Sequence, residues 1–175
     1  LEIREKIGYL PESVPLYTDM TVTEYLSFMG SIRGMKKNKL SNQISNVIEQ
    51  CRLGDYRHTI IGKLSKGYRQ RVGVAQAVIH EPEVLVLDEP TIGIDPIQVV
   101  ETRKLIKELG ESDRTLILST HILPEVSMLC KRILIIHQGK IVAEDTPNNL
   151  SSRLKGAEQI SIEVKGPQKQ IQQTL

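Results

Sequence analysis

The chain has 175 residues, of which 39% are hydrophobic and 25% are charged, and its formal net charge at pH 7 is +2. This composition is ordinary for one globular domain with a sizeable core. The small net charge argues against nucleic acid as a partner, and no apolar run approaches the ~20 residues of a membrane-spanning helix.

The N-terminal part of the chain predicts one strand and two helices. Residues 6–10 form a short apolar run that ends at a proline, so we expect a strand followed by a loop. Thr21 and Glu24 have the spacing of a capping box, which would start an amphipathic helix. A second helix is expected over residues 40–51, after a solvated turn at residues 36–39 that carries three lysines.

The central stretch predicts a turn, a helix and a strand that ends in two acids. The turn brings a hydroxyl and a cation to the start of the helix and comprises Ser65, Lys66, Gly67 and Tyr68. The free N–H groups at a helix start suit an anion such as phosphate. Residues 84–87 are a continuous apolar run, typical of a strand buried on both faces of a parallel sheet. Asp88 and Glu89 follow, at the strand end where open α/β sheets place their ligands.

The next elements are predicted from turn residues and apolar runs. Asp95 and Pro96 are well suited to start a helix, as the N-cap and the first helical residue. Residues 115–119 form a second apolar run, which we interpret as another buried strand. If this strand lies parallel to the preceding one, it delivers His121 beside the two acids. A short helix is expected from Leu123.

The C-terminal part predicts a hairpin, a helix and one further strand. Residues 132–137 and 140–144 flank a Gln-Gly turn, which indicates two antiparallel strands. A helix would follow and end at about residue 154. Residues 160–164 alternate between apolar and polar side chains, and we interpret them as the first strand of a small appended domain.

Two adjacent acids after a buried strand have a specific chemical use. The first can hold Mg²⁺, usually through water, and the second can orient or deprotonate a water that attacks a γ-phosphate. The alternative is a solvated strand end, which the apolar run and the Asp-Glu pair alone would favour. The upstream turn at residues 65–68 favours the catalytic interpretation over the solvated strand end, because the turn is itself suited to phosphate.

Five motifs, in order along the chain, resemble those of the ATP-binding cassette (ABC) ATPases. LSKGYRQR at residues 64–71 is similar to the signature loop, LSGGQ-x-x-R, and LVLDEP at residues 85–90 is similar to the Walker B strand. Residues 93–96 resemble the D-loop, residues 119–121 the strand end with the switch histidine, and IGYLPE at residues 7–12 the Q-loop. The resemblance therefore covers most of the chain.

The resemblance implies an α/β fold, namely a partial P-loop NTPase core with a mostly parallel sheet and an inserted α-helical subdomain. Residues 1–155 would form the ATPase domain, with the helical subdomain at about residues 14–80, and residues 156–175 would start a truncated C-terminal extension. The sequence contains no G-x-x-x-x-G-K-[ST] phosphate loop. We therefore expect a fragment that lacks the N-terminal third of the domain and has little activity alone.

The resemblance also assigns roles to individual residues. Glu89 would be the catalytic base, assisted by His121 and Glu12, and Asp88 and Glu12 would hold Mg²⁺. The residues that would bind ATP or contact the opposite chain of a head-to-tail dimer are Ser65, Lys66, Gly67, Tyr68 and Asp95.

Three of these residues depart from the family pattern. Glu12 stands in place of a glutamine, and its carboxylate adds negative charge and cannot donate as an amide does. Lys66 replaces a glycine and Tyr68 replaces a glutamine. The cation of Lys66 would either strengthen the attraction to phosphate or, because of its bulk, clash at a tight approach.

The implied function is that of the ATP-binding and hydrolysing subunit of an ABC transporter, of the exporter type found in drug-export and gliding-motility systems. The expected cofactors are ATP and Mg²⁺. The expected partners are a second ABC ATPase subunit, identical or paired, and a separate polytopic membrane permease, with no nucleic acid.

Such a subunit would be a peripheral protein at the cytoplasmic face of the cell membrane. Cys51 and Cys130 are isolated, which fits packing roles in a reducing cytosol. Two alternatives remain open: a soluble ABC ATPase that is not coupled to a transporter, and a catalytically incompetent interaction fragment.

Overall fold

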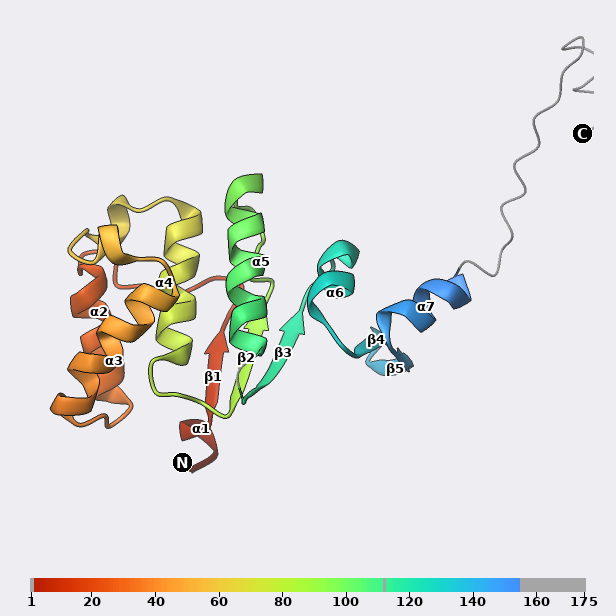
Figure 1. The fold of residues 1–175 in the computed structure, drawn as a ribbon, viewed down its shortest axis with the longest axis horizontal. Helices are drawn as coiled ribbons and strands as arrows, with labels where there is room; N and C mark the ends of the chain where they lie inside the picture. Colours follow the sequence, from red (N-terminus) through yellow and green to blue (C-terminus); the bar gives the residue numbers. More distant parts are fainter. Residues whose placement is uncertain (1, 112, 155–175) are drawn as a thin grey trace, which may run out of the picture. The chain divides into compact units, whose positions relative to one another are not determined.

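The fold is known from a computed structural model, which describes residues 2–111 and 113–154 (Figure 1). The chain divides into two compact units, Leu1–Cys130 and Lys131–Leu175. The elements of the first unit are, in order, α1 (Glu2–Glu5), β1 (Ile7–Leu10), α2 (Val22–Ile32), α3 (Lys37–Gln50), the 3₁₀ turns η1 (Gly54–Tyr56) and η2 (Ile61–Lys63), α4 (Lys66–Val78), β2 (Val84–Asp88), α5 (Pro96–Gly110), β3 (Thr115–Ser119) and α6 (Leu123–Leu129). Every strand and long helix predicted for this unit is confirmed; α1 and the two 3₁₀ turns were not predicted.

The three strands of the first unit form one parallel sheet in the order β1-β2-β3. Leu10 pairs with Leu87, and Asp88 pairs with Ser119. The carboxyl ends of all three strands therefore meet at the same edge, which confirms the predicted α/β fold with a parallel sheet. This edge is where the sequence places both acids and the switch histidine.

The two faces of this sheet are not equally covered. Leu10, Leu85 and Leu87 are fully buried on the face where α4 and α5 pack. Tyr9 and Ile117 lie on the other face and are 47% and 50% exposed. The prediction that β3 is a buried strand is therefore wrong for the described residues. Its side chains alternate between exposed and half-buried, because only one face of the sheet carries helices in this part of the chain.

Two glycines let α4 pack closely on β1. A Cβ on Gly8 would collide with the carbonyl oxygen of Ala77 and would lie 2.9 Å from Cγ of Pro82. On the helix, a Cβ on Gly73 would lie 2.7 Å from Cδ1 of Leu10. Both distances are shorter than real side chains tolerate, so the backbones of strand and helix approach each other because neither residue has a side chain.

The helices α2, α3 and α4 pack together beside the sheet (Figure 1). The capping box predicted at the start of α2 is confirmed: the Glu24 amide donates to Thr21 Oγ1 at 3.3 Å, and the Thr21 amide donates to Glu24 Oε2 at 2.8 Å. The solvated turn predicted at residues 36–39 is wrong, because Lys37 and Lys39 lie in the first turn of α3. Their side chains are exposed, as expected.

The second unit begins with a hairpin, as predicted. Strands β4 (Ile133–His137) and β5 (Lys140–Asp145) are antiparallel, and Gln138 and Gly139 turn between them with φ of 49° and 73°. The helix α7 (Pro147–Leu154) follows, as predicted. The strand predicted at residues 160–164 lies outside the described residues. None of the helices described is both long and apolar enough to cross a membrane.

Candidate functional site

The carboxyl end of β2 places two acids at the end of the sheet. Asp88 is the last residue of the strand, and Glu89 begins the turn that leaves it. Glu89 has a φ of 44°, which is unusual for a residue with a side chain. Its amide donates to the carbonyl of Ser119 at 2.9 Å, and its own carbonyl accepts from Ile92 at 3.1 Å. The turn is thus tied to the end of β3.

Glu89 and His121 form a hydrogen-bonded pair across the ends of β2 and β3. The carboxylate oxygen Oε1 of Glu89 lies 2.7 Å from Nδ1 of His121 and accepts from the His121 amide at 3.1 Å. The hydrogen bond to Glu89, and then the negative charge of Glu89, raise the pKa of His121 above its usual value of 6.5. The other oxygen of Glu89, Oε2, is buried and has no hydrogen-bond partner among the residues that the structure describes.

A second carboxylate in this region, Glu125, is fully buried. Its Oε1 accepts from Thr91 Oγ1 at 2.5 Å and from the guanidinium of Arg103 at 3.2 Å. Its Oε2 accepts from Thr120 Oγ1 at 3.2 Å. One buried side chain on α6 therefore joins the turn after β2, the helix α5 and the turn after β3.

The signature-like residues lie at the start of α4. Ser65 is the N-cap, and its hydroxyl accepts from the Tyr68 amide at 3.4 Å. The prediction that residues 65–68 form a turn before the helix is wrong, because Lys66, Gly67 and Tyr68 form the first turn of the helix itself. A serine at this position ends the preceding extended segment and caps the helix, which is why the helix begins so early. Ser65 itself is exposed.

Contacts with α5 hold this helix start in place. Arg71 is only 3% exposed, and its Nη2 donates to Gln98 Oε1 and Glu101 Oε2, both at 2.8 Å. Gly67 packs against Gln98 so closely that a Cβ there would lie 2.9 Å from Cγ of Gln98. At the start of α5, Asp95 is the N-cap, which confirms the predicted helix start, and it accepts from two backbone amides.

The two residues that depart from the signature pattern have different surroundings. The Tyr68 ring packs against Tyr56, with 4.1 Å between ring centroids, and the Arg71 guanidinium lies 5.1 Å from the Tyr68 centroid. Lys66 is exposed, and its ammonium lies so close to Gly93 that a Cβ on this glycine would collide with it. Gly93 has a φ of 65°, a conformation that favours glycine.

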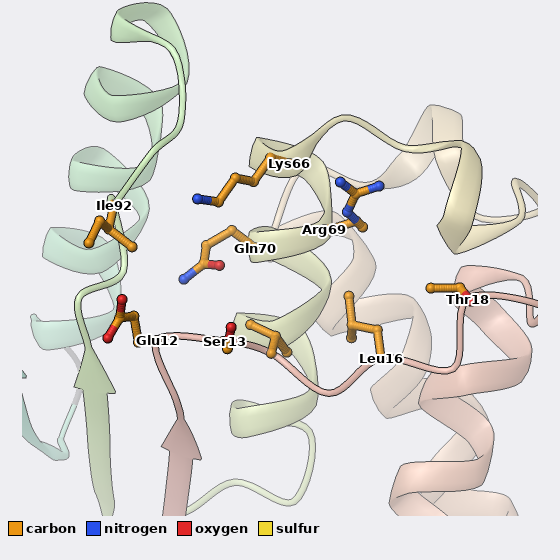
Figure 2. Close-up of a pocket in the computed structure, with 9 residues that line it drawn as sticks. Glu12, Ser13, Leu16, Thr18, Lys66, Arg69, Gln70 and Ile92 are labelled. Carbon is orange, nitrogen blue, oxygen red and sulfur yellow. The ribbon is translucent and has the colours of Figure 1, made fainter.

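A cleft of about 350 Å³ separates the Q-loop-like segment from the start of α4 (Figure 2). Lys66 and Gln70 extend from α4 into it, and Glu12 and Ile92 stand on the opposite side. Gln70 is only 5% exposed, and its Nε2 has no partner among the described residues. Glu12 is exposed and lies near enough to raise the pKa of His121 slightly.

The structure thus brings together some of the predicted site residues and keeps others apart. Glu89 and His121 are in direct contact, and Glu12 and Lys66 line one cleft. No hydrogen bond or ion pair within residues 2–111 and 113–154 joins the start of α4 to Asp88, Glu89 or His121.

The carboxylates offer the oxygen donors that Mg²⁺ prefers. Asp88 is half-buried at the end of β2, and Glu12 is exposed at the rim of the cleft. In the described part of the chain, no three His, Cys, Asp or Glu side chains cluster as a metal site. Mg²⁺ is usually bound through one or two carboxylates with water and substrate phosphates, so the donors at this edge suit that ion in a nucleotide complex.

Comparison with known proteins identifies the family. The family model described as ABC transporter matches residues 1–92, more than half of the chain. The chain belongs to the ABC transporter family. An uncharacterised ABC transporter ATP-binding protein of Methanocaldococcus jannaschii is 42% identical over 81% of this chain and 54% of its own length. The linearmycin resistance ATP-binding protein LnrL of Bacillus subtilis is 36% identical over 93% of this chain and 52% of its own length.

Two further ABC proteins are similar. The bacitracin transport ATP-binding protein BcrA of Bacillus licheniformis is 39% identical over 87% of the chain and 49% of its own length. A solved structure of CbiO1 from Clostridium perfringens, part of the ABC transporter complex CbiONQ, matches with a TM-score of 0.78 and 25% identity, over 90% of this chain and 66% of that one. The chain spans about half the length of the three sequence relatives named here.

The ABC motifs predicted the contact between Glu89 and His121 but not the residues that hold it. Glu125, Thr91 and Arg103 were not singled out, and neither was the buried amide of Gln70. In the sequence, Glu125 is recognisable only as an acid four residues after His121, on a short predicted helix. An acid at such a position is equally compatible with exposure to solvent. The two threonines, Thr91 and Thr120, each lie within two residues of a predicted site residue.

Proposed function

We propose that this chain is the signature and Walker B part of an ATP-hydrolysing subunit that powers an ABC transporter. The single observation that carries the proposal is the state of the Glu89 carboxylate. One oxygen is bound by the amide and ring of His121, and the other is buried without a partner in the described residues. The two contacts with His121 fix this carboxylate at the strand end where open α/β sheets place their ligands, a position from which it can orient a water.

In this proposal Glu89 orients the water and accepts its proton, which is the role of a general base. His121 holds Glu89 in position, and its raised pKa favours the imidazolium form, which can stabilise negative charge on a γ-phosphate. Asp88 and Glu12 would hold Mg²⁺, and Mg²⁺, when bound with ATP, would neutralise charge on the phosphates. Glu12 is the less favourable ligand, because it is exposed at the cleft rim.

The start of a second chain's α4 would supply the other half of the site. Ser65 is exposed, and the first amides of a helix lack intrahelical acceptors, so this end can approach an anion. Lys66 would add a positive charge, whereas Gly67 is buried against Gln98 and could offer only its backbone amide. Tyr68 contributes less, because its ring is engaged with Tyr56. Asp95 caps α5 beside these residues and would face the opposite chain.

A membrane subunit is the proposed partner of the cleft. The cleft offers the amide of Gln70 as a donor, which has no partner among the described residues. Tyr17 lies in the chain between the lining residues Leu16 and Thr18 and forms an edge-to-face pair with Phe28, and the two aromatic residues are 54% and 37% exposed. LnrL and BcrA are named for antibiotic resistance and transport, and CbiO1 belongs to a transporter complex. By analogy, this chain would act at the cytoplasmic face of the membrane. Loss of a co-purifying membrane protein on Tyr17→Ala with Phe28→Ala would support this partner, and unchanged co-purification would reject it.

The test of hydrolysis measures ATP binding and turnover in a protein that carries this chain together with a phosphate loop. Glu89→Gln should leave ATP binding intact and reduce turnover at least ~100-fold, because the amide cannot accept the proton. Glu83→Gln is the matched control: it lies at the other end of β2, with an exposed side chain paired to Lys6. Undiminished turnover in the Glu89 variant, with turnover in the control unchanged, would reject Glu89 as the base.

A further inference from the structure

Glu125 is the most completely buried acid in the described part of the chain, with no exposed surface. Burying a carboxylate is costly unless donors surround it. Glu125 has such donors from Thr91, Thr120 and Arg103. The guanidinium of Arg103 is 22% exposed and supplies the compensating charge.

The placement of these donors relates Glu125 to the Glu89 and His121 pair. Thr91 lies two residues after Glu89, and Thr120 directly precedes His121. Glu125 therefore binds one neighbour of each member of the pair, one through each of its two oxygens.

Thr120 also sets the shape of the turn that presents His121. Its hydroxyl donates to Glu125 and accepts from the Ile122 amide at 3.1 Å. His121 lies between Thr120 and Ile122 in the chain, and both its amide and its ring contact the same oxygen of Glu89. The shape of this turn therefore goes together with the contact that His121 makes to Glu89.

We propose that Glu125 is a positioning residue for the Glu89 and His121 pair, holding the turns after β2 and β3 at the separation that their contact requires. Its importance for hydrolysis rests on the proposed function; its effect on the geometry does not. In the described part of the chain no hydrogen bond or ion pair joins Glu125 to Glu89 or His121, and its charge contributes only a lesser part of the raised pKa of His121. Its direct contacts with the two turns are those with Thr91 and Thr120.

The alternative is that Glu125 only anchors α6 to α5 through Arg103, with no effect on the site. The two cases differ in what Thr120→Val should do. This substitution removes the hydroxyl that links the turn to Glu125 and keeps the size of the side chain and the charge of Glu125. A pure anchor would leave His121 unchanged in this variant, and a positioning residue would not.

The experiment is nuclear magnetic resonance of the full chain, which reads the His121 amide and imidazole directly. The variants are Thr120→Val, Glu125→Gln and Glu125→Asp, and Thr115→Val is the control, because Thr115 is an exposed threonine at the far end of β3. In the three test variants we expect the His121 amide to exchange with solvent roughly fivefold to tenfold faster, as the loss of one hydrogen bond implies. The Nδ1 resonance should also move toward that of a free imidazole. Amides of α2 should not change.

Three outcomes would overturn the proposal. His121 signals that are unchanged in Thr120→Val would do so even if the Glu125 variants fail to fold. Signals that change in Glu125→Gln but not in Glu125→Asp would indicate an effect of charge alone. An equal change in Thr115→Val would indicate a general loosening of β3. Because these signals do not depend on turnover, they separate a failure of this proposal from a failure of the proposed ATPase function.

Discussion

We expect the two partners of the ion pair between α4 and α5, Arg71 and Glu101, to contribute unequally to the free energy of unfolding. Arg71 is 3% exposed and donates to Gln98 and Glu101, whereas the Glu101 side chain is 45% exposed. Removing the acid leaves a buried cation, and removing the cation leaves an acid that water can reach. We therefore expect Glu101→Ala to cost more than Arg71→Met, although Arg71 is the more buried residue.

The magnitudes follow from the two environments. Removing one partner of a fully buried pair costs about 3–5 kcal/mol. Because Gln98 would still accept from Arg71, we expect about 2–3 kcal/mol for Glu101→Ala. Arg71→Met retains much of the buried volume and avoids desolvating a charge, so we expect a loss below about 1 kcal/mol.

Urea denaturation of each variant, followed by circular dichroism, measures these differences in the free energy of unfolding. The control is Glu108→Ala, which removes a partly exposed acid bound to Arg52 at 2.9 Å and should cost at most about 1 kcal/mol. A larger loss for Arg71→Met than for Glu101→Ala would refute the reasoning. It would mean that the arginine stabilises the chain by its charge and not merely by its volume.

Two further predictions concern the site and the sheet. Glu89→Gln should lower the pKa of His121, measured by nuclear magnetic resonance, because the hydrogen bond and charge of Glu89 raise it. Since the folded pKa exceeds the unfolded value, this contact stabilises the fold fully below about pH 6.5 and is lost as the pH rises through the folded pKa. Urea midpoints from about pH 6 to about pH 9 should show this decrease in the parent chain and not in Glu89→Gln. Gly8→Ala should lower the free energy of unfolding by more than about 2 kcal/mol in the same assay, because the new methyl group would meet the backbone of α4. The control is Gly54→Ala, because a methyl group on Gly54 would meet only open space. Equal stability of the two alanine variants would contradict the close approach of α4 to β1.

The sequence predicted the parts of this fold that depend on short-range signals. The capping box at Thr21 and the N-cap at Asp95 each specify a helix start within a few residues, and both are present. The contact between Glu89 and His121 was also predictable, because neighbouring parallel strands bring their carboxyl ends to one edge. That prediction depended on the condition that the two strands are parallel neighbours, which the resemblance to ABC ATPases implied and the structure confirms.

Other features depend on packing between distant segments and could not be read from local patterns. An apolar run such as residues 115–119 is compatible with burial on both faces, and only the tertiary arrangement shows that one face is open in the described residues. The partners of Glu125 lie 34, 22 and 5 residues away in sequence. No periodicity distinguishes such an acid from one on the solvent face of a short helix.

The backbone of Glu89 connects the site to the stability of the sheet. A φ of 44° in a residue with a side chain costs on the order of 1 kcal/mol, and a glycine would avoid this cost. The fold nevertheless has a glutamate here, and its amide and carboxylate are tied to Ser119 and His121. The strain is therefore offset by contacts that also orient the carboxylate. Glu125 accepts from one threonine in each turn, and our proposal makes the buried acid and the strained one parts of a single arrangement.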